Sequence, residues 1–531
     1  MARTPLFDAL HRALQLARLA NRPDSPPADE LVEMQREAVW TRRHFLRTSM
    51  ASAFTLASGD LFSAFAAQPL GIRPRIVIVG AGIAGLNAAY KLKKAGLHAE
   101  IYEASTRVGG RIFTAKDIMA YGLTTELGGE FIDSHHKEML RLAREFEFKL
   151  IDTRDPDEAS FIPETYFFNG QHYTEKEVIE AFRPIAARIE SDLREVGKTV
   201  NFKHHNRAAM RLDHLSLSEY FEKISVTGWL RQLLDVAYIT EYGLDSDQQS
   251  PFNLLSLIGT DLSKGVEIYG ESDERFKIKG GNQRLVDELA SRLQDQLRVG
   301  YRLEAIKSRG KGFLLTFQNP NGLALDIDAD FVVICIPFSL LRSVAIRIEL
   351  PDVKRKAIHE LGYGTSAKVM AGFHHRLWRD LGYTGNIFTD KEFQSGWDNS
   401  RRQGRESGGL TFLLGGTSGV AVGTGPAAGQ ASRLMAGAES AFPGLSSEFN
   451  GNVARFHWPS FPFALGSYAC YKPGQWTTIA GSEIEPVGHL FFAGEHCSED
   501  FQGFMNGAAE TGKAAAHSLL SAIRSTKRVT R

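Results

Sequence analysis

Apolar runs and helical patterns alternate along the chain from about residue 73 onward. Residues 75–79, Arg-Ile-Val-Ile-Val, form a β-branched run that predicts a strand buried in a parallel sheet. A helical stretch follows from Leu86 to Ala95, and a second strand is predicted over 98–102, with Glu103 at its end. Strands that alternate with helices in this way predict an α/β domain built on a parallel sheet.

Three later segments extend this picture. The unbroken apolar run at 329–337 predicts another strand of the buried sheet. Residues 151–267 are rich in charge and carry helical patterns at 175–196 and 217–234 without a known catalytic motif, so we expect them to roof a pocket. A strand is predicted at 410–414, and the Gly- and Ser-rich residues after it predict a loop.

The turn after the first predicted strand reads Gly-Ala-Gly-Ile-Ala-Gly, from Gly80 to Gly85. In a dinucleotide-binding turn the first glycine allows the tight bend, the second lets the backbone approach a pyrophosphate, and the third lets the helix pack on the strand. Gly80, Gly82 and Gly85 take these places, and Ala84 lies in the same turn. Glu103 is placed to accept hydrogen bonds from ribose hydroxyls, which favours FAD or NAD over NADP.

The segment after this acidic residue separates FAD from NAD. Two adjacent glycines at 109–110 lie between Arg107 and Arg111. They supply a flexible turn, and the arginines supply two cations beside the diphosphate. Each arginine alone would be interpreted as a surface charge, but together with the preceding turn they favour contact with bound FAD.

Composition excludes several classes of partner. The chain has 531 residues, and its 62 Lys plus Arg equal its 62 Asp plus Glu, which argues against a nucleic-acid partner. Its three cysteines form no Cys-x-x-Cys pair and predict neither a disulfide framework nor a thiolate zinc site. The adjacent histidines at 135–136, 204–205 and 374–375 should point apart, so we expect no metal site.

Residues 1–67 are predicted to be an N-terminal extension with a signal for export. Arg42-Arg43 precede a mildly apolar stretch, 50–67, with a small-residue pattern at 64–66, as in twin-arginine signal peptides. An ordinary basic helix with a disordered linker is the alternative. We expect the twin-arginine export machinery to deliver the folded chain to the periplasm or the exterior. No other segment approaches the ~18–20 apolar residues that span a bilayer, so no integral membrane segment is expected.

Five motifs, in order, resemble those of the flavin monoamine oxidase family, which comprises monoamine oxidases, polyamine oxidases and L-amino-acid oxidases. The similarity runs from about Arg73 to Leu520. The motifs are the glycine turn at 80–85, the stretch 103–111, residues 126–132, the Lys-Gly-Gly-Asn sequence at 279–282, and the C-terminal segments 490–495 and 503–512.

The resemblance implies a Rossmann-like FAD-binding domain of the amine oxidase type, interwoven with an α+β substrate-binding domain. The expected FAD-binding parts are 73–150, 268–340 and 456–531, and the expected substrate-binding parts are 151–267 and 341–455. Beyond the glycine turn, the resemblance implies FAD contacts from Glu103, Arg111, Gly128, Gly129, Glu130, Leu303, Gly494, Glu495 and Met505.

The resemblance also implies catalytic residues. Lys368 matches the family lysine that holds a water at flavin N5, although a lysine on an edge strand facing solvent would fit the same pattern. Tyr468 and Phe504 match the two aromatic residues between which relatives hold the substrate amine, and either could instead be core packing. Trp458 could be pocket wall or core.

Two departures from the family bear on the cofactor and the substrate. Animal monoamine oxidases attach FAD through a cysteine where this chain has Ser467, and Cys470 would face the opposite side of a strand, so we expect non-covalent FAD. Many L-amino-acid oxidases carry an arginine after the Gly-Gly pair that clamps the substrate carboxylate. Glu130 and Phe131 stand there instead, which favours an amine substrate.

The sequence thus predicts an FAD-dependent oxidase that converts an amine to an imine, reduces O2 to H2O2, and loses the imine to hydrolysis. An L-amino-acid oxidase, which gives a 2-oxo acid, ammonia and H2O2, is the nearest alternative. A flavin desaturase or isomerase of an apolar substrate would lack both the lysine and the aromatic pair, and a flavin-binding protein without activity is a further alternative. The individual substrate, the electron acceptor and a homodimeric state are left open.

Overall fold

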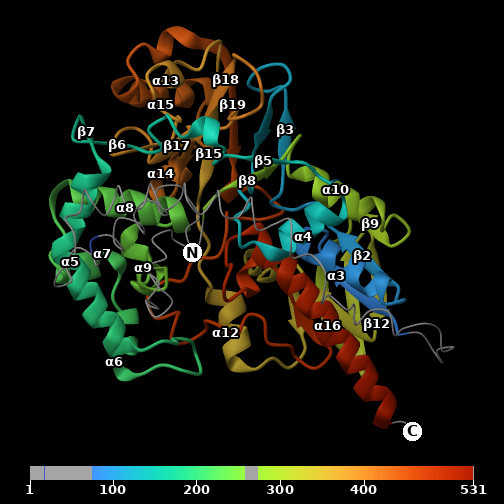
Figure 1. Ribbon diagram of the computed structural model, residues 1–531. Helices are drawn as coiled ribbons and strands as arrows, with labels where there is room; N and C mark the ends of the chain where they lie inside the picture. Colours follow the sequence, from blue (N-terminus) through green and yellow to red (C-terminus); the bar gives the residue numbers. More distant parts are fainter. Residues whose placement is uncertain (1–16, 18–73, 258–272, 530–531) are drawn as a thin grey trace, which may run out of the picture.

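The computed structural model describes Ala17, residues 74–257 and residues 273–529 (Figure 1). The predicted export signal lies outside the described residues. The predicted strand, helix and strand at the start are confirmed as β1 (Ile76–Val79), α3 (Ile83–Lys94) and β2 (Ala99–Glu103). The helix begins before the expected Leu86 because Gly82 is its N-cap.

A five-stranded parallel sheet, in the order β20-β13-β1-β2-β9, confirms the α/β class. Its further strands are β9 (Leu297–Val299), β13 (Phe331–Ile334) and β20 (Leu490–Phe492). The long C-terminal helix α16 (Met505–Val529) packs against α3 (Figure 1). The two helices approach closely because Gly512 has no side chain: a Cβ there would lie 2.1 Å from the carbonyl oxygen of Ala84.

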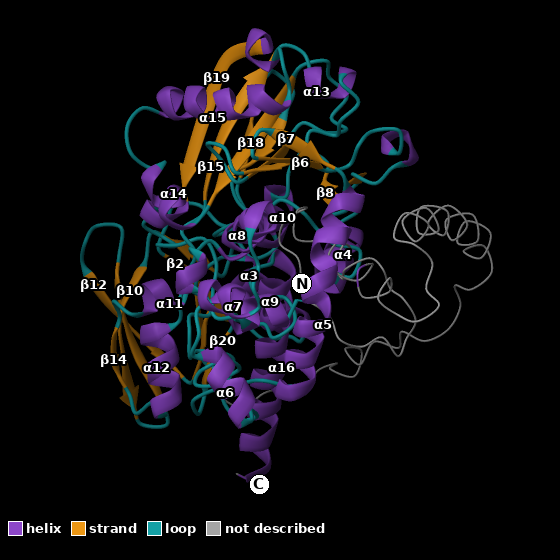
Figure 2. Ribbon diagram, turned by 90° about the vertical axis from the view of Figure 1, so that its left-hand side faces the viewer, coloured by secondary structure: helices purple, strands orange, loops and turns teal. Residues whose placement is uncertain are grey.

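A seven-stranded sheet, in the order β19-β15-β18-β17-β16-β6-β7, forms a second unit at the top of Figure 2. Its strands are β6 (Thr165–Phe168), β7 (Gln171–Tyr173), β15 (Ala367–Phe373), β16 (Ile387–Thr389), β17 (Ser395–Asp398), β18 (Gly408–Leu414) and β19 (Phe449–His457). Because β15 pairs with β18 on one side and β19 on the other, the edge-strand alternative for Lys368 is wrong.

The loop predicted after residue 414 is also wrong. Two helices, α14 (Gly416–Ala421) and α15 (Ala427–Ala441), follow β18 instead. Helix α15 buries Ala431, Leu434 and Ala438 in the apolar cluster of the seven-stranded sheet. This helical spacing is hard to recognise in the sequence because glycine, serine and alanine fill most of the other positions.

A four-stranded sheet, in the order β12-β11-β10-β14, shares an apolar cluster with the parallel sheet. Its strands are β10 (Arg302–Arg309), β11 (Gly312–Gln318), β12 (Ala324–Ala329) and β14 (Ala345–Arg347). Figure 2 shows this sheet apart from the seven-stranded one.

A group of helices on the left of Figure 1 has its own apolar cluster. Its members are α5 (Glu175–Val196), α6 (Arg207–Asp213), α7 (Leu217–Lys223), α8 (Gly228–Tyr242) and α9 (Phe252–Leu255). The helix predicted over 175–196 is confirmed. The pattern at 217–234 belongs to two helices, because Ser225, with φ of 60°, turns the chain between α7 and α8.

The shorter elements connect these units. They are the pairs β3 (Thr114–Lys116) with β4 (Thr124–Glu126) and β5 (Leu150–Asp152) with β8 (Phe276–Ile278), and the helices α4 (Lys137–Glu145), α10 (Gln283–Ser291), α11 (Phe338–Leu341), α12 (Asp352–Glu360) and α13 (Leu377–Asp380).

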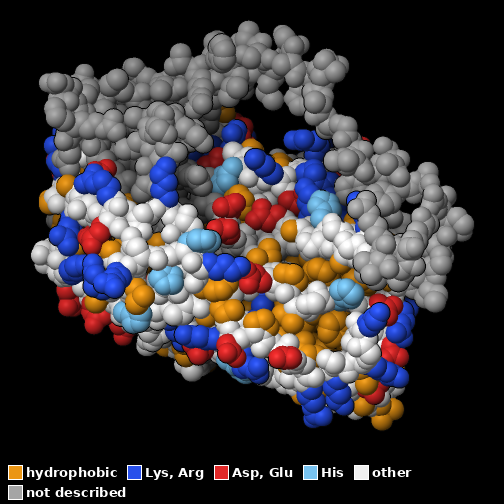
Figure 3. Space-filling model, turned by 90° about the horizontal axis from the view of Figure 1, so that it is seen from below, with side chains coloured by type: hydrophobic (Ala, Val, Ile, Leu, Met, Phe, Trp, Pro, Cys, Tyr) orange, Lys and Arg blue, Asp and Glu red, His pale blue; other side chains and the backbone are white. Residues whose placement is uncertain are grey.

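Two further predictions concern the domain limits and the membrane-spanning segments. The predicted domain limits after residues 150, 340 and 455 fall inside β5, α11 and β19, and the division into domains stays a prediction. Across the residues described, no helix combines the length and the apolar character that crossing a membrane requires. Figure 3 shows a group of apolar side chains on one face, with basic and acidic side chains intermixed around it.

Candidate active site

A cavity of about 570 Å³ lies at the carboxyl ends of the parallel strands and extends to β15 and β18. This edge of a parallel sheet is where α/β proteins bind ligands. Every site residue predicted from the sequence lines it except Gly85: Gly80, Gly82, Ala84, Glu103, Arg111, Gly128, Gly129, Glu130, Leu303, Lys368, Tyr468, Gly494, Glu495, Phe504 and Met505.

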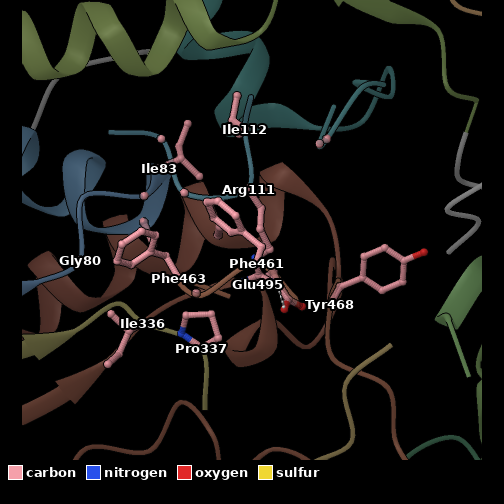
Figure 4. A pocket seen from close by; sticks show the side chains of 18 of the residues that line it. Gly80, Ile83, Arg111, Ile112, Ile336, Pro337, Phe461, Phe463, Tyr468 and Glu495 are labelled. Carbon is pink, nitrogen blue, oxygen red and sulfur yellow. Dashed lines mark hydrogen bonds and ion pairs between the residues drawn. The ribbon is translucent and has the colours of Figure 1, made fainter. Parts of the chain in front are cut away.

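The glycine turn closes one end of the cavity, where Figure 4 shows Gly80 and Ile83. Gly80 has φ of 102°, a conformation that glycine adopts readily. Gly85 faces the strand instead of the cavity, since a Cβ there would lie 2.0 Å from the Gly80 carbonyl oxygen. At Gly82 a Cβ would meet nothing within 4 Å, so space is open where α3 begins. A helix N-terminus with open space before it can receive a phosphate.

Glu103 ties this turn to the end of β2. Its Oε2 accepts a hydrogen bond of 2.7 Å from the Ala81 N–H, and its Oε1 accepts one of 2.8 Å from the Ser105 N–H. Burial raises the pKa of Glu103. Each carboxylate oxygen has a second lone pair with which to accept a ribose hydroxyl.

The two arginines after the turn have different surroundings. The Arg107 guanidinium donates to the carbonyls of Gly110 and Ile112 and lies 4.0 Å from the Phe113 ring centroid, so it braces the loop. Arg111 instead pairs with Glu495 at 2.8 Å, an ion pair marked in Figure 4.

Glu495 joins three segments of the chain. Besides Arg111, its carboxylate accepts the Ala469 N–H at 3.1 Å and the Gly503 N–H at 2.7 Å. Arg111 in turn donates to the Ser467 carbonyl at 2.8 Å. These bonds fix the backbone on either side of Tyr468 and in front of Phe504.

The Lys368 ammonium lies at the wall of the cavity and has three acceptors. It donates to the carbonyl oxygens of Glu126 at 3.0 Å and Gly128 at 2.9 Å, and to Oε2 of Glu130 at 3.0 Å. Burial alone would raise the pKa of Glu130, but the charges of Lys277 and Lys368 hold it below its usual value. The Glu130 carboxylate is therefore already paired, and its charge gives no separate argument for a cationic substrate.

The predicted aromatic pair lines the same cavity. The Tyr468 hydroxyl donates to the Thr240 carbonyl at 2.9 Å and accepts from the Ser366 hydroxyl at 3.2 Å. The Phe504 ring packs edge to face on His136, with centroids 5.0 Å apart. Both rings are held from behind, as a site that orients a substrate needs.

Sequence reasoning missed several lining residues. Trp397 and Leu413 lie in the lining, and nothing in their local sequence separates them from core positions; Phe131 also lies there, and its place in the motif at 126–132 could have identified it. Trp458, left open between wall and core, is both: it lines the cavity, and its indole N–H donates to the Leu127 carbonyl at 3.1 Å. Phe461 and Phe463 extend the apolar wall towards Gly80 (Figure 4).

The position of the cysteines relative to the cavity bears on how FAD would be attached. Ser467 lines the cavity, whereas Cys470 is buried beside the Asn253 amide, which it meets at 3.4 Å. Cys335 lines the cavity, and burial raises the pKa of its thiol.

The expectation that adjacent histidines point apart is wrong for His135 and His136, whose ring centroids lie 5.2 Å apart because they occupy a turn. They could hold a metal ion together with Asp133, since the ligand atoms lie within 4.8 Å of one another. Nδ1 of His136, however, accepts the Asp133 N–H at 2.9 Å. In a neutral ring the proton is then on Nε2, which faces the Asp133 carboxylate at 3.2 Å and has no lone pair for a metal.

The residues present fit FAD along the whole cavity. The open helix N-terminus suits a pyrophosphate, Glu103 suits a ribose, and the aromatic end beside Lys368 suits a flavin ring and a small substrate.

Comparisons with known proteins agree with a flavin site. The sequence model of a family described as flavin containing amine oxidoreductase matches residues 83–520. The chain is 23% identical over 467 residues to the flavin-containing amine oxidase of Danio rerio, covering 84% of this chain and 86% of that protein. It is 25% identical over 468 residues to the L-amino-acid oxidase of Daboia russelii, covering 83% and 88%. The structure of cyclohexylamine oxidase from Brevibacterium oxydans IH-35A matches with a TM-score of 0.74 at 20% identity, over 85% of this chain and 100% of that chain, which shows the fold.

Proposed function

Because the chain belongs to the family of flavin containing amine oxidoreductases, we propose that it is an FAD-dependent oxidase of an amine. Its reaction converts R–CH2–NH2 and O2 to R–CH=NH and H2O2, and water then hydrolyses the imine to an aldehyde and ammonia. The two electrons and two protons that leave the amine are those that O2 gains. A bound FAD supplies the chemistry of this transfer by accepting the hydride equivalent from the carbon next to nitrogen.

One observation carries the preference for an amine over an amino acid. Each arginine of the described lining is already bonded within the protein: Arg107 to loop carbonyls, Arg111 to Glu495 and Arg302 to Glu304. Lys368 likewise donates to three protein acceptors. The described lining thus offers a substrate carboxylate no uncommitted cation of the kind that a bidentate clamp needs.

The residues of the chain then have separate tasks. Tyr468 and Phe504 present aromatic faces that exclude water and orient the neutral amine. The ammonium of Lys368 provides a fixed positive charge beside the reacting centre. Glu103, Arg111 and Glu495 hold the backbone segments that would surround FAD.

Anaerobic bleaching of the visible flavin absorbance tests this proposal. The holoenzyme is mixed with a panel of primary and secondary amines and a matched panel of L-amino acids. We expect bleaching by at least one amine and by none of the amino acids. Bleaching by L-amino acids alone would establish the L-amino-acid oxidase instead, and no bleaching by either panel would favour a desaturase, an isomerase or a protein without activity.

We further propose that the twin-arginine pathway exports the chain, on the pattern of Arg42-Arg43 and the apolar stretch that follows. Replacing both arginines by lysine keeps the charge and should retain the protein in the cytoplasm of a bacterium that has this pathway. Cell fractionation with an FAD assay measures the result. Equal export of the two forms would contradict the proposal.

A further inference from the structure

Three buried charged side chains lie in a row that begins at the cavity wall and ends behind it. Lys277 on β8 pairs with Oε1 of Glu130 at 3.0 Å, and Lys368 on β15 pairs with Oε2 of the same carboxylate at 3.0 Å. Their side chains are 6%, 3% and 8% exposed, in the order Lys277, Glu130 and Lys368. Glu130 and Lys368 line the cavity, whereas Lys277 is absent from the described lining and pairs with Glu130 from behind.

The hydrogen bonds fix the charge of Lys368. A neutral amine has two N–H groups, but Lys368 donates to three acceptors, two carbonyls and a carboxylate, so it is an ammonium with every proton engaged. A water held by Lys368 would have to replace one of these acceptors. The ammonium also lies 5.1 Å from the Trp397 ring centroid, which suits a cation.

Lys277 has similar surroundings. Its Nζ donates to Glu130 and to the Asn399 carbonyl at 3.4 Å, and it lies 5.4 Å from the centroid of the Phe131 ring. The contact between Phe131 and Trp397, with centroids 5.9 Å apart, continues the layer to the aromatic partner of Lys368. Two lysines and one carboxylate give a net charge of +1, which burial leaves largely unscreened.

Other titratable groups near this row are carboxyls. Glu126, next to Gly128 in sequence and space, has its pKa raised to about 7 by burial, so it is neutral in mildly acidic solution and adds a negative charge above neutrality. Glu274 lines the cavity as well. The net charge of the row is thus the sum of the charges of Lys277, Glu130 and Lys368, and the ionised form of Glu126 adds a negative charge beside it.

We propose that Lys277 is a positioning residue for flavin reduction: by neutralising Glu130 it leaves the Lys368 charge uncompensated at the cavity wall, where it stabilises the reduced flavin. This inference rests on the proposed function. Reduced flavin is more negatively charged than the oxidised form, so a cation close to the ring favours reduction. A purely structural ion pair would not have this effect, because it would alter stability without changing the charge that the cofactor experiences.

The experiment measures the midpoint potential of bound FAD with a chemical reductant and needs no substrate. Lys277→Met lowers the row to zero charge, and we expect the potential to fall by about 30 mV or more, which is tenfold for a two-electron couple. Glu130→Gln raises the charge, and the potential should rise. The double variant, Lys277→Met with Glu130→Gln, restores +1 and should return the potential close to that of the wild type.

Lys91→Met is the matched control, because Lys91 is also a buried lysine in an ion pair, with Glu138 at 3.2 Å, but does not line the cavity. It should lower the stability and leave the potential unchanged. If Lys277→Met does not fold, Lys277→Gln replaces it with the same expected fall.

Unchanged potentials, or a double variant as low as Lys277→Met, would overturn the inference while leaving the proposed function intact. If the potential shifts as expected but no amine bleaches the flavin, only the proposed function is contradicted. A chain that binds no FAD would overturn both.

Discussion

The Lys368 ammonium and the Glu130 carboxylate lie 3.0 Å apart, although 238 residues separate them in the sequence. The strand β15 carries the lysine from the middle of the seven-stranded sheet, and the turn after β4 carries the carboxylate. Burying either charge alone would be costly, so each makes the position of the other tolerable. The pair connects the substrate-side sheet to the Gly128-Gly129 turn.

Lys368→Met should slow flavin reduction by substrate ~100- to 1,000-fold, the range for removing one preorganised electrostatic group. The methionine keeps much of the apolar stem but leaves the carbonyls of Glu126 and Gly128 without their donor. Stopped-flow absorbance under anaerobic conditions measures the rate. Lys91→Met should match the wild type, and an unchanged rate in Lys368→Met would remove this lysine from the reaction.

Local sequence was enough for the parts of the fold that depend on local physics. The β-branched run at 76–79 and the glycine turn after it specify a strand and a helix start without help from distant residues. By contrast, the turn at Ser225 depends on a left-handed conformation that serine does not signal, and it divided one predicted helix into two. The sequence therefore located the cavity better than it located the helices that surround it.

In the candidate site, too, some residues could be predicted from the sequence and others are recognised only in the folded chain. The position of Glu103 after the glycine turn placed it in the cavity lining, and Lys368 was placed there by its resemblance to the family lysine. Lys277 had no such signal: it lies 147 residues from Glu130, and only the folded chain shows that both lysines share one carboxylate. Trp397 is a comparable case, since an aromatic residue on a strand is indistinguishable from core packing until the cavity is seen.

Glu103→Gln should weaken FAD binding about tenfold, the loss expected for one charge-assisted hydrogen bond of about 1.4 kcal/mol. The amide can replace only one of the two acceptors that now receive the N–H groups of Ala81 and Ser105. Titration of the apoprotein with FAD, followed by fluorescence, gives the affinity. Glu100→Gln is the control on the same strand, since Glu100 bonds only to the Tyr102 hydroxyl among its described partners. Equal affinities of the two variants would contradict the role of Glu103.

Acid precipitation of the holoenzyme should release free FAD to the supernatant. Ser467 lines the cavity where a thiol would be needed for a covalent bond, Cys470 is buried outside the lining, and Cys335, which lines the cavity, lies beside Gly80 at the end closed by the glycine turn. The absorbance of the supernatant and of the redissolved pellet measures the division. Flavin that stays with the pellet after washing would show covalent attachment.

The contribution of Glu483 to the stability of the fold should decrease as pH rises towards neutrality, whereas His496, whose pKa burial lowers to about 4, acts in the opposite direction over this window. This side chain is 2% exposed and accepts from the Tyr471 hydroxyl at 3.2 Å and the Gly481 N–H at 2.8 Å. Burial raises its pKa from 4.5 to about 7. The folded state therefore keeps on Glu483 the proton that the unfolded state has lost between these values, and the contribution of this residue to the free energy of unfolding falls by roughly 3 kcal/mol as pH rises through the window.

Glu483→Gln removes this contribution while keeping the shape of the side chain. Glu126, whose pKa burial also raises to about 7, and the buried His496 contribute equally to both proteins, so the slope of the wild type should be more negative than that of the variant by an amount that sums to roughly 3 kcal/mol over the window. Urea midpoints at intervals from about pH 5 to about pH 8 measure the slope. Glu485→Gln is the control, because Glu485 is more than a third exposed and pairs with Lys203 at the surface. If the Glu483→Gln variant is as pH-dependent as the wild type, this carboxyl ionises in the folded state as it does in the unfolded chain. The charge of the nearby Lys354 would then compensate that of the carboxylate.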